Sequence, residues 1–353
     1  MSKTVSAAAD GVLPLAPKLK QLIGLLGDGR FHSGTELAQS LGISRSAVWK
    51  YQQALADAGV ELLAVSGKGY RLSHPMQLLQ ERQILEHLSN RATALLGRIE
   101  IHDRIHSTNS HLLEIARRSG DSGVVCLAEQ QTGGRGRRGR QWVSPFGHNV
   151  YLSILWRFQS GPAGLNGLSL AMGVAVVRAL RALGIAEVGL KWPNDIYWRQ
   201  RKLAGILIEV GGESGGPCHA VMGLGLNVFL PSRHAAAIDQ AWVDLQAILA
   251  DDAHALRNRL TAELLNHLLP ALAEFESLTL AHFLDEWRSY DCMLHRPASV
   301  FLGEQRFDGE VAGVDAQACC YYARPTARSG LSPPAKSVSG NHDFAGGYRQ
   351  FLS

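Results

Sequence analysis

The spacing of apolar residues over the first quarter of the chain predicts three helices followed by two short strands. Ser33 and Ser44 suit the N-caps of the second and third helices, and Gly42 suits the tight turn between them. Two helices joined by such a turn form a helix-turn-helix, and the strands form its wing. The predicted helices are residues 18–29, 35–42 and 44–59, the strands lie within 60–72, the winged helix-turn-helix domain spans 18–80, and 1–17 is a flexible tail.

The start of the third predicted helix carries polar and basic side chains, and so does the wing. Such side chains at the N-terminal end of a recognition helix are what reading of the DNA major groove requires. A three-helix domain that binds another protein would show the same helical spacing, so the basic residues decide in favour of DNA. The predicted DNA contacts are Ser44, Arg45, Ser46, Trp49, Lys50 and Lys68.

From about Ile99 to Tyr290, short apolar strands alternate with helices. Several strands alternate apolar residues with small or polar ones, which predicts a mixed or antiparallel sheet with one covered face. A linker and one helix over residues 74–100 lead into this region, and an amphipathic pattern over 255–276 predicts a long helix packed on the sheet. We assign residues 81–290 to this central domain.

The last part of the chain changes character within a few residues. Residues 296–315 predict a β-hairpin, so a small β-domain begins over 291–317. Residues 318–353 show little strand pattern and are rich in Ser, Pro, Gly and Arg, a composition typical of disorder. The predicted fold class is therefore α+β, with a winged helix-turn-helix, a central mixed sheet with helices, and an incomplete small β-domain.

The composition of the chain limits the cellular compartment and the kinds of ligand site that we expect. The chain has 353 residues, 46% of them apolar, and no apolar run that approaches a membrane span or a secretory signal, so we expect a cytoplasmic protein without membrane contact. Its five cysteines show no paired metal-ligand spacing, and no metal site built from protein side chains alone is expected. The net charge of +4 permits a local site for nucleic acid or phosphate.

Residues 131–142, Gln-Thr-Gly-Gly-Arg-Gly-Arg-Arg-Gly-Arg-Gln-Trp, concentrate four arginines among glycines. Arginine supplies a fork of hydrogen-bond donors and glycine lets the backbone approach a ligand closely, so this loop is predicted to close over an anion. A basic linker or an RNA-binding tract would be longer than this loop. It would also not be expected to lie between two predicted strands or to end in a tryptophan such as Trp142. The three other polar clusters of the central domain, described next, indicate which anion this is.

Three further clusters lie in the central domain. Ser107, Thr108 and Asn109 precede a helix, where they serve either as its cap or as ligand contacts. Lys191 and Lys202 bracket the turn Pro-Asn-Asp at 193–195 and bring two cations to neighbouring strand ends. Glycines alternate along the strand at 223–225, which marks either a bulge or a close approach of a ligand.

The clusters hold cations and glycines without an evident nucleophile. The chain has no Walker lysine–serine pair, no Gly-x-Ser-x-Gly elbow and no His/Cys metal set. Such a site suits chemistry that depends on positioning and electrostatics. Attack of a carboxylate on the α-phosphate of ATP fits this description.

With these segments assembled, the chain resembles the bifunctional biotin–protein ligases that double as biotin operon repressors. Ser-Thr-Asn at 107–109, the loop at 134–147 and the segment 191–209 are close to the signature segments of that family, in the same order. The winged helix-turn-helix, with Gly-Lys-Gly-Tyr in its wing, is present too. The resemblance covers roughly residues 18–317 and implies a class II synthetase-like ligase fold followed by an SH3-like β-barrel.

The resemblance implies a two-step reaction. Biotin and Mg-ATP give biotinyl-5′-adenylate and pyrophosphate, and the biotinyl group then passes to a lysine of the biotin carboxyl carrier protein of acetyl-CoA carboxylase. It implies Lys202 and Arg137 as catalytic residues. It implies that biotin is bound by Ser107, Thr108, Asn109, Gln131, Arg135, Gly136, Arg137, Lys202, Gly205, Gly223 and Gly225, and that the nucleotide is bound, in part through Mg²⁺, by Arg135, Arg137, Arg138, Trp142, Lys191, Asn194, Asp195 and Asn227.

The resemblance also implies regulation and exposes one departure. Repressor members dimerise through a sheet edge when they hold the adenylate, and the homodimer then binds operator DNA. Where the family ends in an apolar strand and a motif close to Gly-Gly-Glu-Val-Ser-Leu-Arg, this chain continues differently from Ala318. With suitable codons, a reading two bases later restores both features, so we hypothesise a shifted reading frame near Ala318.

Two alternatives share part of this evidence. A lipoate or octanoate transferase has the same catalytic fold, but the full arginine–glycine loop and Lys202 favour biotin. A biotin-responsive regulator with impaired ligase activity would keep the helix-turn-helix, and the atypical end of the chain keeps that alternative open.

Overall fold

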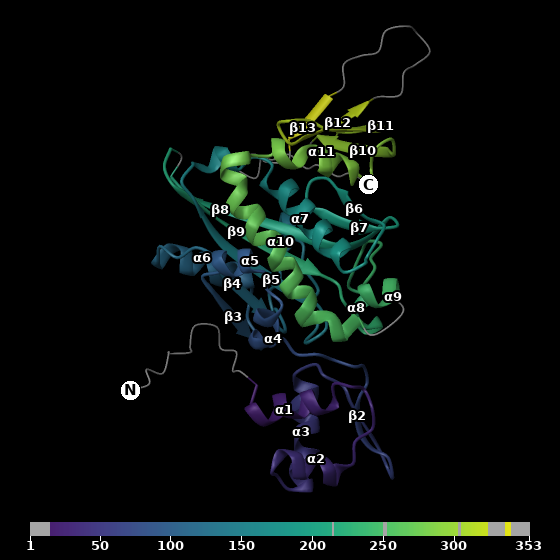
Figure 1. Ribbon diagram of the computed structural model, residues 1–353. Helices are drawn as coiled ribbons and strands as arrows, with labels where there is room; N and C mark the ends of the chain where they lie inside the picture. The colour runs from purple at the N-terminus through teal and green to yellow at the C-terminus, as the bar shows by residue number, and fades with distance from the viewer. Residues whose placement is uncertain (1–14, 214, 250–252, 303–304, 324–335, 340–353) are drawn as a thin grey trace.

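The computed structural model describes residues 15–213, 215–249, 253–302, 305–323 and 336–339. Figure 1 shows the N-terminal helical domain at one end, the central sheet with its helices in the middle, and a small sheet at the other end. Most of the predicted tail at 1–17, and most of the atypical segment at 318–353, lies outside the described residues.

The N-terminal domain is the predicted winged helix-turn-helix. Ser33 accepts a hydrogen bond from the Glu36 amide at 3.0 Å, and Ser44 accepts one from the Ala47 amide at 3.2 Å. Gly42 adopts φ 59°, a left-handed conformation that ends the second helix and that glycine takes without strain. The elements are α1 (Pro17–Leu26), α2 (Gly34–Leu41), α3 (Arg45–Asp57), β1 (Leu62–Val65) and β2 (Gly69–Leu72).

The connection to the central domain differs from the single helix that we expected. It contains two short helices, α4 (Glu81–Glu86) and α5 (Asn90–Leu95). Ser89 separates them because its side chain accepts a hydrogen bond from the Ala92 amide at 3.1 Å and so starts a new helix.

A seven-stranded sheet forms the central domain, with strand order β3-β4-β5-β9-β8-β7-β6. β3 and β4 are parallel and the other neighbours are antiparallel, so the sheet is mixed, as predicted. The strands are β3 (Arg98–His102), β4 (Val124–Ala128), β5 (Val150–Phe158), β6 (Val188–Lys191), β7 (Asp195–Trp198), β8 (Arg201–Gly212) and β9 (Cys218–Leu226).

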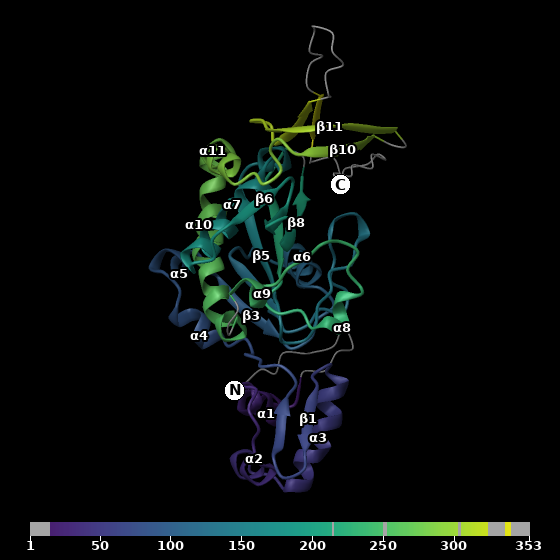
Figure 2. The same cartoon turned by 90° about the vertical axis from the view of Figure 1, so that its right-hand side faces the viewer.

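Helices cover the two faces of this sheet unequally. Figure 2 shows α10 (Arg257–Leu278) on one side of the sheet, with α7 (Leu168–Ala182) and α11 (Ala281–Ser289), and α6 (Thr108–Arg118) on the other. The first group builds the large core, whereas α6 covers a smaller apolar cluster. The expectation of one covered face is corrected: the second face is partly covered, which leaves space beside α6.

Among the described residues, one helical segment, Pro162–Ala182, is long and apolar enough to cross a membrane by length and composition, although no such segment was expected from the sequence. In the structure 72% of its apolar stretch is buried. Packing of α7 between the sheet and α10 accounts for this apolar surface.

A second, four-stranded antiparallel sheet lies beyond α11 and consists of β10 (Pro297–Leu302), β11 (Gln305–Val314), β12 (Cys319–Ala323) and β13 (Lys336–Ser339). The hairpin of β10 and β11 is the predicted one. The expectation that strand structure stops at Gln317 is wrong, because β12 pairs with β11 and buries Cys320 and Tyr322. Within the part of the chain that the structure describes, this sheet does not close into a barrel, and the reading-frame hypothesis stays a prediction.

Candidate active site

A cavity of about 710 Å³ opens on the partly covered face of the central sheet. Its volume lies within the range of small-molecule sites. Strands β7 to β9 form its floor, and the start of α6 and the arginine–glycine loop form its sides. All predicted biotin and nucleotide contacts line it: Ser107, Thr108, Asn109, Gln131, Arg135, Gly136, Arg137, Arg138, Trp142, Lys191, Asn194, Asp195, Lys202, Gly205, Gly223, Gly225 and Asn227.

Neutral polar side chains are linked to one another at the α6 end of the cavity. Ser107 caps α6, so the capping role weighed for it is confirmed. The amide and the hydroxyl of Thr108 both donate to Gln131 Oε1, at 2.9 and 3.1 Å. Ser153 Oγ, fully buried on β5, lies 2.7 Å from Thr108 Oγ1. Ser153 was not predicted as a site residue; a serine within an otherwise apolar strand was its only signal in the sequence.

Asn109 joins this network to a carboxylate. Its Oδ1 accepts from Ser153 Oγ at 2.6 Å, and its Nδ2 donates to Glu209 Oε2 at 2.8 Å. Arg135 donates to the same carboxylate at 3.2 Å and to Ser110 Oγ at 3.1 Å. Each of these groups is therefore held in place before any ligand enters.

The glycines of the floor make room for side chains of the protein itself. A Cβ on Gly223 would lie 2.2 Å from Asn109 Oδ1, and one on Gly225 would lie 2.3 Å from the Trp142 indole. Gly205 pairs with Gly225 across the ladder, and the indole also lies over it. Of the two alternatives weighed for these glycines, the ladder runs through them without a bulge, and the close approach that the structure shows is that of protein side chains. The indole nitrogen of Trp142 is buried without a hydrogen-bond partner among the described residues.

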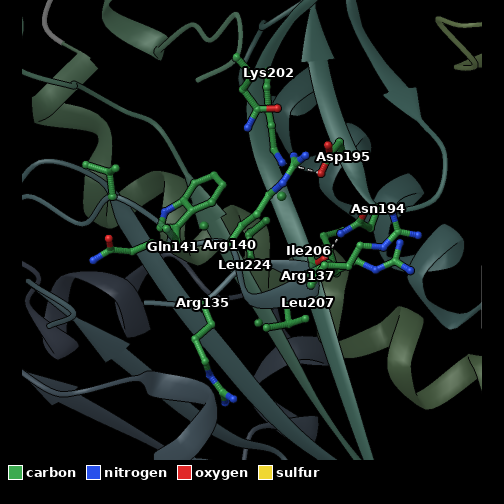
Figure 3. Close-up of a pocket in the computed structure, with 18 of the residues that line it drawn as sticks. Arg135, Arg137, Arg140, Gln141, Asn194, Asp195, Lys202, Ile206, Leu207 and Leu224 are labelled. Atoms are coloured by element: carbon green, nitrogen blue, oxygen red, sulfur yellow. Dashed lines mark hydrogen bonds and ion pairs between the residues drawn. The ribbon is translucent and has the colours of Figure 1, made fainter. Parts of the chain in front are cut away.

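The other end of the cavity is charged. Lys202 Nζ pairs with Asp195 at 2.8 Å, and the Lys202 side chain is 13% exposed (Figure 3). Asn194 Nδ2 donates to the Ile206 carbonyl at 2.6 Å and holds the turn between β6 and β7 against β8. Burial lowers the pKa of Lys191, and Asp195 opposes that shift only in part.

The arginine–glycine loop folds back on itself over this end. The Gly136 amide donates to the Arg140 carbonyl at 2.7 Å, and Arg138 adopts φ 58°. In Figure 3, Arg137 extends toward Asn194, whereas Arg135 extends away from Lys202 toward the α6 end. The loop thus divides its arginines between the two ends of the cavity.

Cations dominate the lining of the cavity. Among the described lining residues, four arginines and two lysines face two aspartates, Asp195 and Asp239. The wall therefore favours an anion, with the greatest density of positive charge near Lys202.

The cavity is also lined by two segments that were not predicted to belong to the site. Cys320 and Tyr322 come from β12, and the Tyr322 hydroxyl is buried without a hydrogen-bond partner among the described residues. Trp192 Nε1 donates to the Ala318 carbonyl at 3.0 Å, which ties the second sheet to this wall. Residues 237–240 and Trp242 close another side. Neither β12 nor the segment 237–242 contains a motif or a hydrophobic pattern that would predict a ligand-binding role.

The predicted DNA contacts lie on the surface of the N-terminal domain. Trp49 is 65% exposed, and the other five are exposed as well. Ser44 caps α3 and Lys68 lies over the Phe31 ring at 6.0 Å. The remaining members, Arg45, Ser46 and Lys50, lie with Trp49 on the first turns of α3.

Comparisons with known proteins match both halves of this architecture. Residues 101–227 match the biotin/lipoate A/B protein ligase family, and residues 18–71 match an HTH domain. The chain is 43% identical over 312 residues to the bifunctional ligase/repressor BirA of Escherichia coli, covering 87% of this chain and 91% of that protein. It is also 43% identical over 300 residues to the protein of the same name from Salmonella typhimurium, covering 84% and 89%.

A solved structure shares the fold. The biotin protein ligase from Aquifex aeolicus in complex with biotin and ATP superposes with a TM-score of 0.57 at 24% identity, covering 73% of this chain and all of that one. The identity over nearly the whole length, together with the two matched domains, shows that the chain belongs to the family of bifunctional biotin–protein ligases and repressors.

Proposed function

We propose that the cavity binds biotin at its neutral end and ATP at its charged end, and joins them. The observation that carries this proposal is the polarity of the cavity. Thr108, Asn109 and Gln131 offer fixed neutral donors and acceptors that suit a ureido ring, while Lys191, Lys202 and Arg137 suit phosphates.

The first step forms the adenylate. A carboxylate oxygen of biotin attacks the α-phosphorus of ATP, a new P–O bond forms, and the bond to the β-phosphate bridging oxygen breaks to release pyrophosphate. Lys202 and Arg137 stabilise the negative charge that spreads over the α-phosphate oxygens during this exchange. Asp195 holds Lys202 in position before ATP enters.

The nucleotide substrate in this scheme is Mg-ATP, and Asp195 and Asn194 would hold its magnesium ion. Magnesium prefers hard oxygen ligands and keeps several waters, and the carboxylate of Asp195 with the side-chain oxygen of Asn194 are such ligands at the charged end. When bound, the ion neutralises charge on the departing pyrophosphate.

The second step transfers the biotinyl group. The amine of a carrier lysine attacks the acyl carbon of the adenylate, an amide forms, and AMP leaves. The carrier in this proposal is the biotin carboxyl carrier protein of acetyl-CoA carboxylase, and the reaction takes place in the cytoplasm.

The N-terminal domain adds repression of the biotin operon. In this proposal the adenylate-bound chain forms a homodimer and binds operator DNA through α3 and the wing. β8 supports a sheet-edge dimer: β7 pairs with it only up to Gly205, so among the described strands residues 207–212 have β9 on one side and no strand on the other.

Transfer and DNA binding are tested together. The chain is incubated with biotin, Mg-ATP and the carrier protein, and the carrier is analysed by intact mass; we expect one biotinyl group on one lysine. The same chain, with and without biotin and Mg-ATP, is titrated onto biotin-operon DNA, and we expect tighter binding with both. An unmodified carrier contradicts the ligase, and DNA binding unaffected by biotin and ATP contradicts the repressor.

A further inference from the structure

A cluster of metal-binding side chains lies on the α6 face of the sheet, outside the residues that line the cavity. Glu100 and His102 come from β3, Cys126 comes from β4 and His111 comes from α6. Glu100 and His102 are two residues apart on one strand, so they point to the same face, and Glu100 is the register partner of Cys126. Residues from three elements are thus gathered at one point.

The distances suit a single cation. The ligand atoms of His102, His111 and Cys126 all lie within 4.8 Å of one another. Glu100 Oε2 lies 2.6 Å from His111 Nε2 and 3.7 Å from His102 Nε2. A tetrahedral zinc site has bonds of about 2.0–2.3 Å, which puts its ligand atoms roughly 3.3–3.8 Å apart. Small side-chain rotations therefore bring the two imidazoles and the thiol to one ion, whereas Glu100, which is not within 4.8 Å of all three, reaches it only through a larger rotation of its side chain.

A hydrogen-bond network without metal accounts for only part of the cluster. It explains the close contact between His111 and Glu100. It leaves His102 Nε2, which is buried and lies 3.7 Å from Glu100 Oε2, beyond hydrogen-bond distance, with no other hydrogen-bond partner among the described residues. It also leaves the Cys126 thiol, which is fully buried and forms no disulfide. Buried polar atoms without partners are uncommon in native structures and call for a specific explanation such as an ion.

We propose that His102, His111 and Cys126 bind one Zn²⁺, with Glu100 as the fourth ligand. Imidazole and thiolate ligands select zinc and cobalt over magnesium and calcium, which prefer oxygen ligands. The site is distinct from the Mg-ATP end of the cavity, and its existence is independent of the proposed ligase reaction. It differs from the expectation that the chain contains no His/Cys metal set, because the proposed ligands are distant in sequence and meet only in the fold.

The site fastens the start of α6 to the sheet edge. The His111 amide donates to the Ser107 carbonyl at 3.1 Å, so the helical turn that carries His111 is the turn that presents Ser107, Thr108 and Asn109 to the cavity. An ion that binds only the folded chain stabilises it in proportion to the logarithm of the ion concentration. Zinc is therefore expected to raise the melting temperature.

Cobalt titration tests the site directly. The full chain is stripped with a chelator, dialysed, and titrated with Co²⁺ in the absence of ATP. We expect one equivalent to bind with visible d–d bands of a tetrahedral site and a thiolate-to-cobalt charge-transfer band, and Zn²⁺ to displace it. We expect His102→Gln and His111→Gln each to weaken binding at least ~10-fold, since even outer-shell changes have that effect, and Cys126→Ala to lose the thiolate band.

Matched controls use residues of the same type elsewhere, His267→Gln and Cys319→Ser, and both are expected to leave the titration unchanged. His102 and His111 are 32% and 29% exposed, so their variants report on the site even if Cys126→Ala fails to fold. The proposal is overturned if the unchanged chain gives no thiolate band, or if the band and the affinity survive both histidine substitutions.

Discussion

The two ends of the cavity are built in opposite ways. At the α6 end, Thr108, Asn109 and Gln131 are neutral and satisfy one another through hydrogen bonds, so the protein itself fixes their positions. At the other end, Lys191 and Lys202 lie with Arg137 and Arg140 around Asp195, and this carboxylate offsets the repulsion among the cations only in part. The difference indicates that one end is organised before binding, whereas the other is completed by an anion.

Substitution of Lys202 should have the largest effect, because it removes the buried cation at the charged end. For Lys202→Ala we expect adenylate formation, measured as pyrophosphate release in a single turnover, to slow by on the order of 10²–10³-fold. Biotin binding without ATP should weaken by a much smaller factor than adenylate formation slows. Arg201→Ala is the control, since that neighbouring side chain lies over Trp198 outside the cavity. An unchanged rate in Lys202→Ala would remove this residue from the catalytic step.

Gly223→Ala tests the organised end. The added methyl group would lie 2.2 Å from Asn109 Oδ1, so Asn109 must move and its network must open. Overpacking of this kind costs about 1–3 kcal/mol, and we expect a loss of that size in biotin affinity, measured by calorimetry without ATP. Gly120→Ala, where nothing lies within 4 Å, is the control. If Gly223→Ala binds biotin normally, the network is not part of the biotin site.

Arg137→Ala tests the loop over the charged end. We expect the bound adenylate to dissociate about tenfold faster, equivalent to ~1.4 kcal/mol, while its formation slows less than in Lys202→Ala. Dissociation is followed by trapping released adenylate from preloaded protein. Equal retention in Arg137→Ala and the exposed control Arg82→Ala would show that the loop does not hold the adenylate.

The smallest effect concerns pH. Burial lowers the pKa of Lys191, so this lysine loses its charge at a lower pH than an ordinary lysine, and ATP binding should weaken as pH rises through that region. Lys191→Arg keeps the charge, because the guanidinium stays protonated. We expect the alkaline decline of adenylate formation to move to higher pH in the variant. A decline at the same pH in both proteins would assign it to another group.

The sequence predicted the elements that depend on local pattern. Helical spacing and the caps at Ser33 and Ser44 were sufficient for the winged helix-turn-helix, and the resemblance of three short segments identified the residues that line the cavity. Ser153 and Glu209 were missed because their partners come from other elements. A pattern within one strand carries no information about those partners.

Two other features that the sequence did not predict have the same physical origin. β12 lacks a clear alternation of apolar and polar residues, and its pairing with β11 and contact with Trp192 position it instead. His102, His111 and Cys126 have no metal-ligand spacing in sequence, since the parallel pairing of β3 with β4 and the packing of α6 bring them together. Long-range contacts, rather than local propensity, determine these features.

The most direct test of the account is mass spectrometry on the 353-residue protein after incubation with biotin, ATP and magnesium. The account predicts that biotinyl-5′-adenylate copurifies with the chain and that omission of either biotin or ATP abolishes it. If no adenylate forms while biotin and ATP each bind, the two-ended cavity does not join its ligands, and the central claim is wrong.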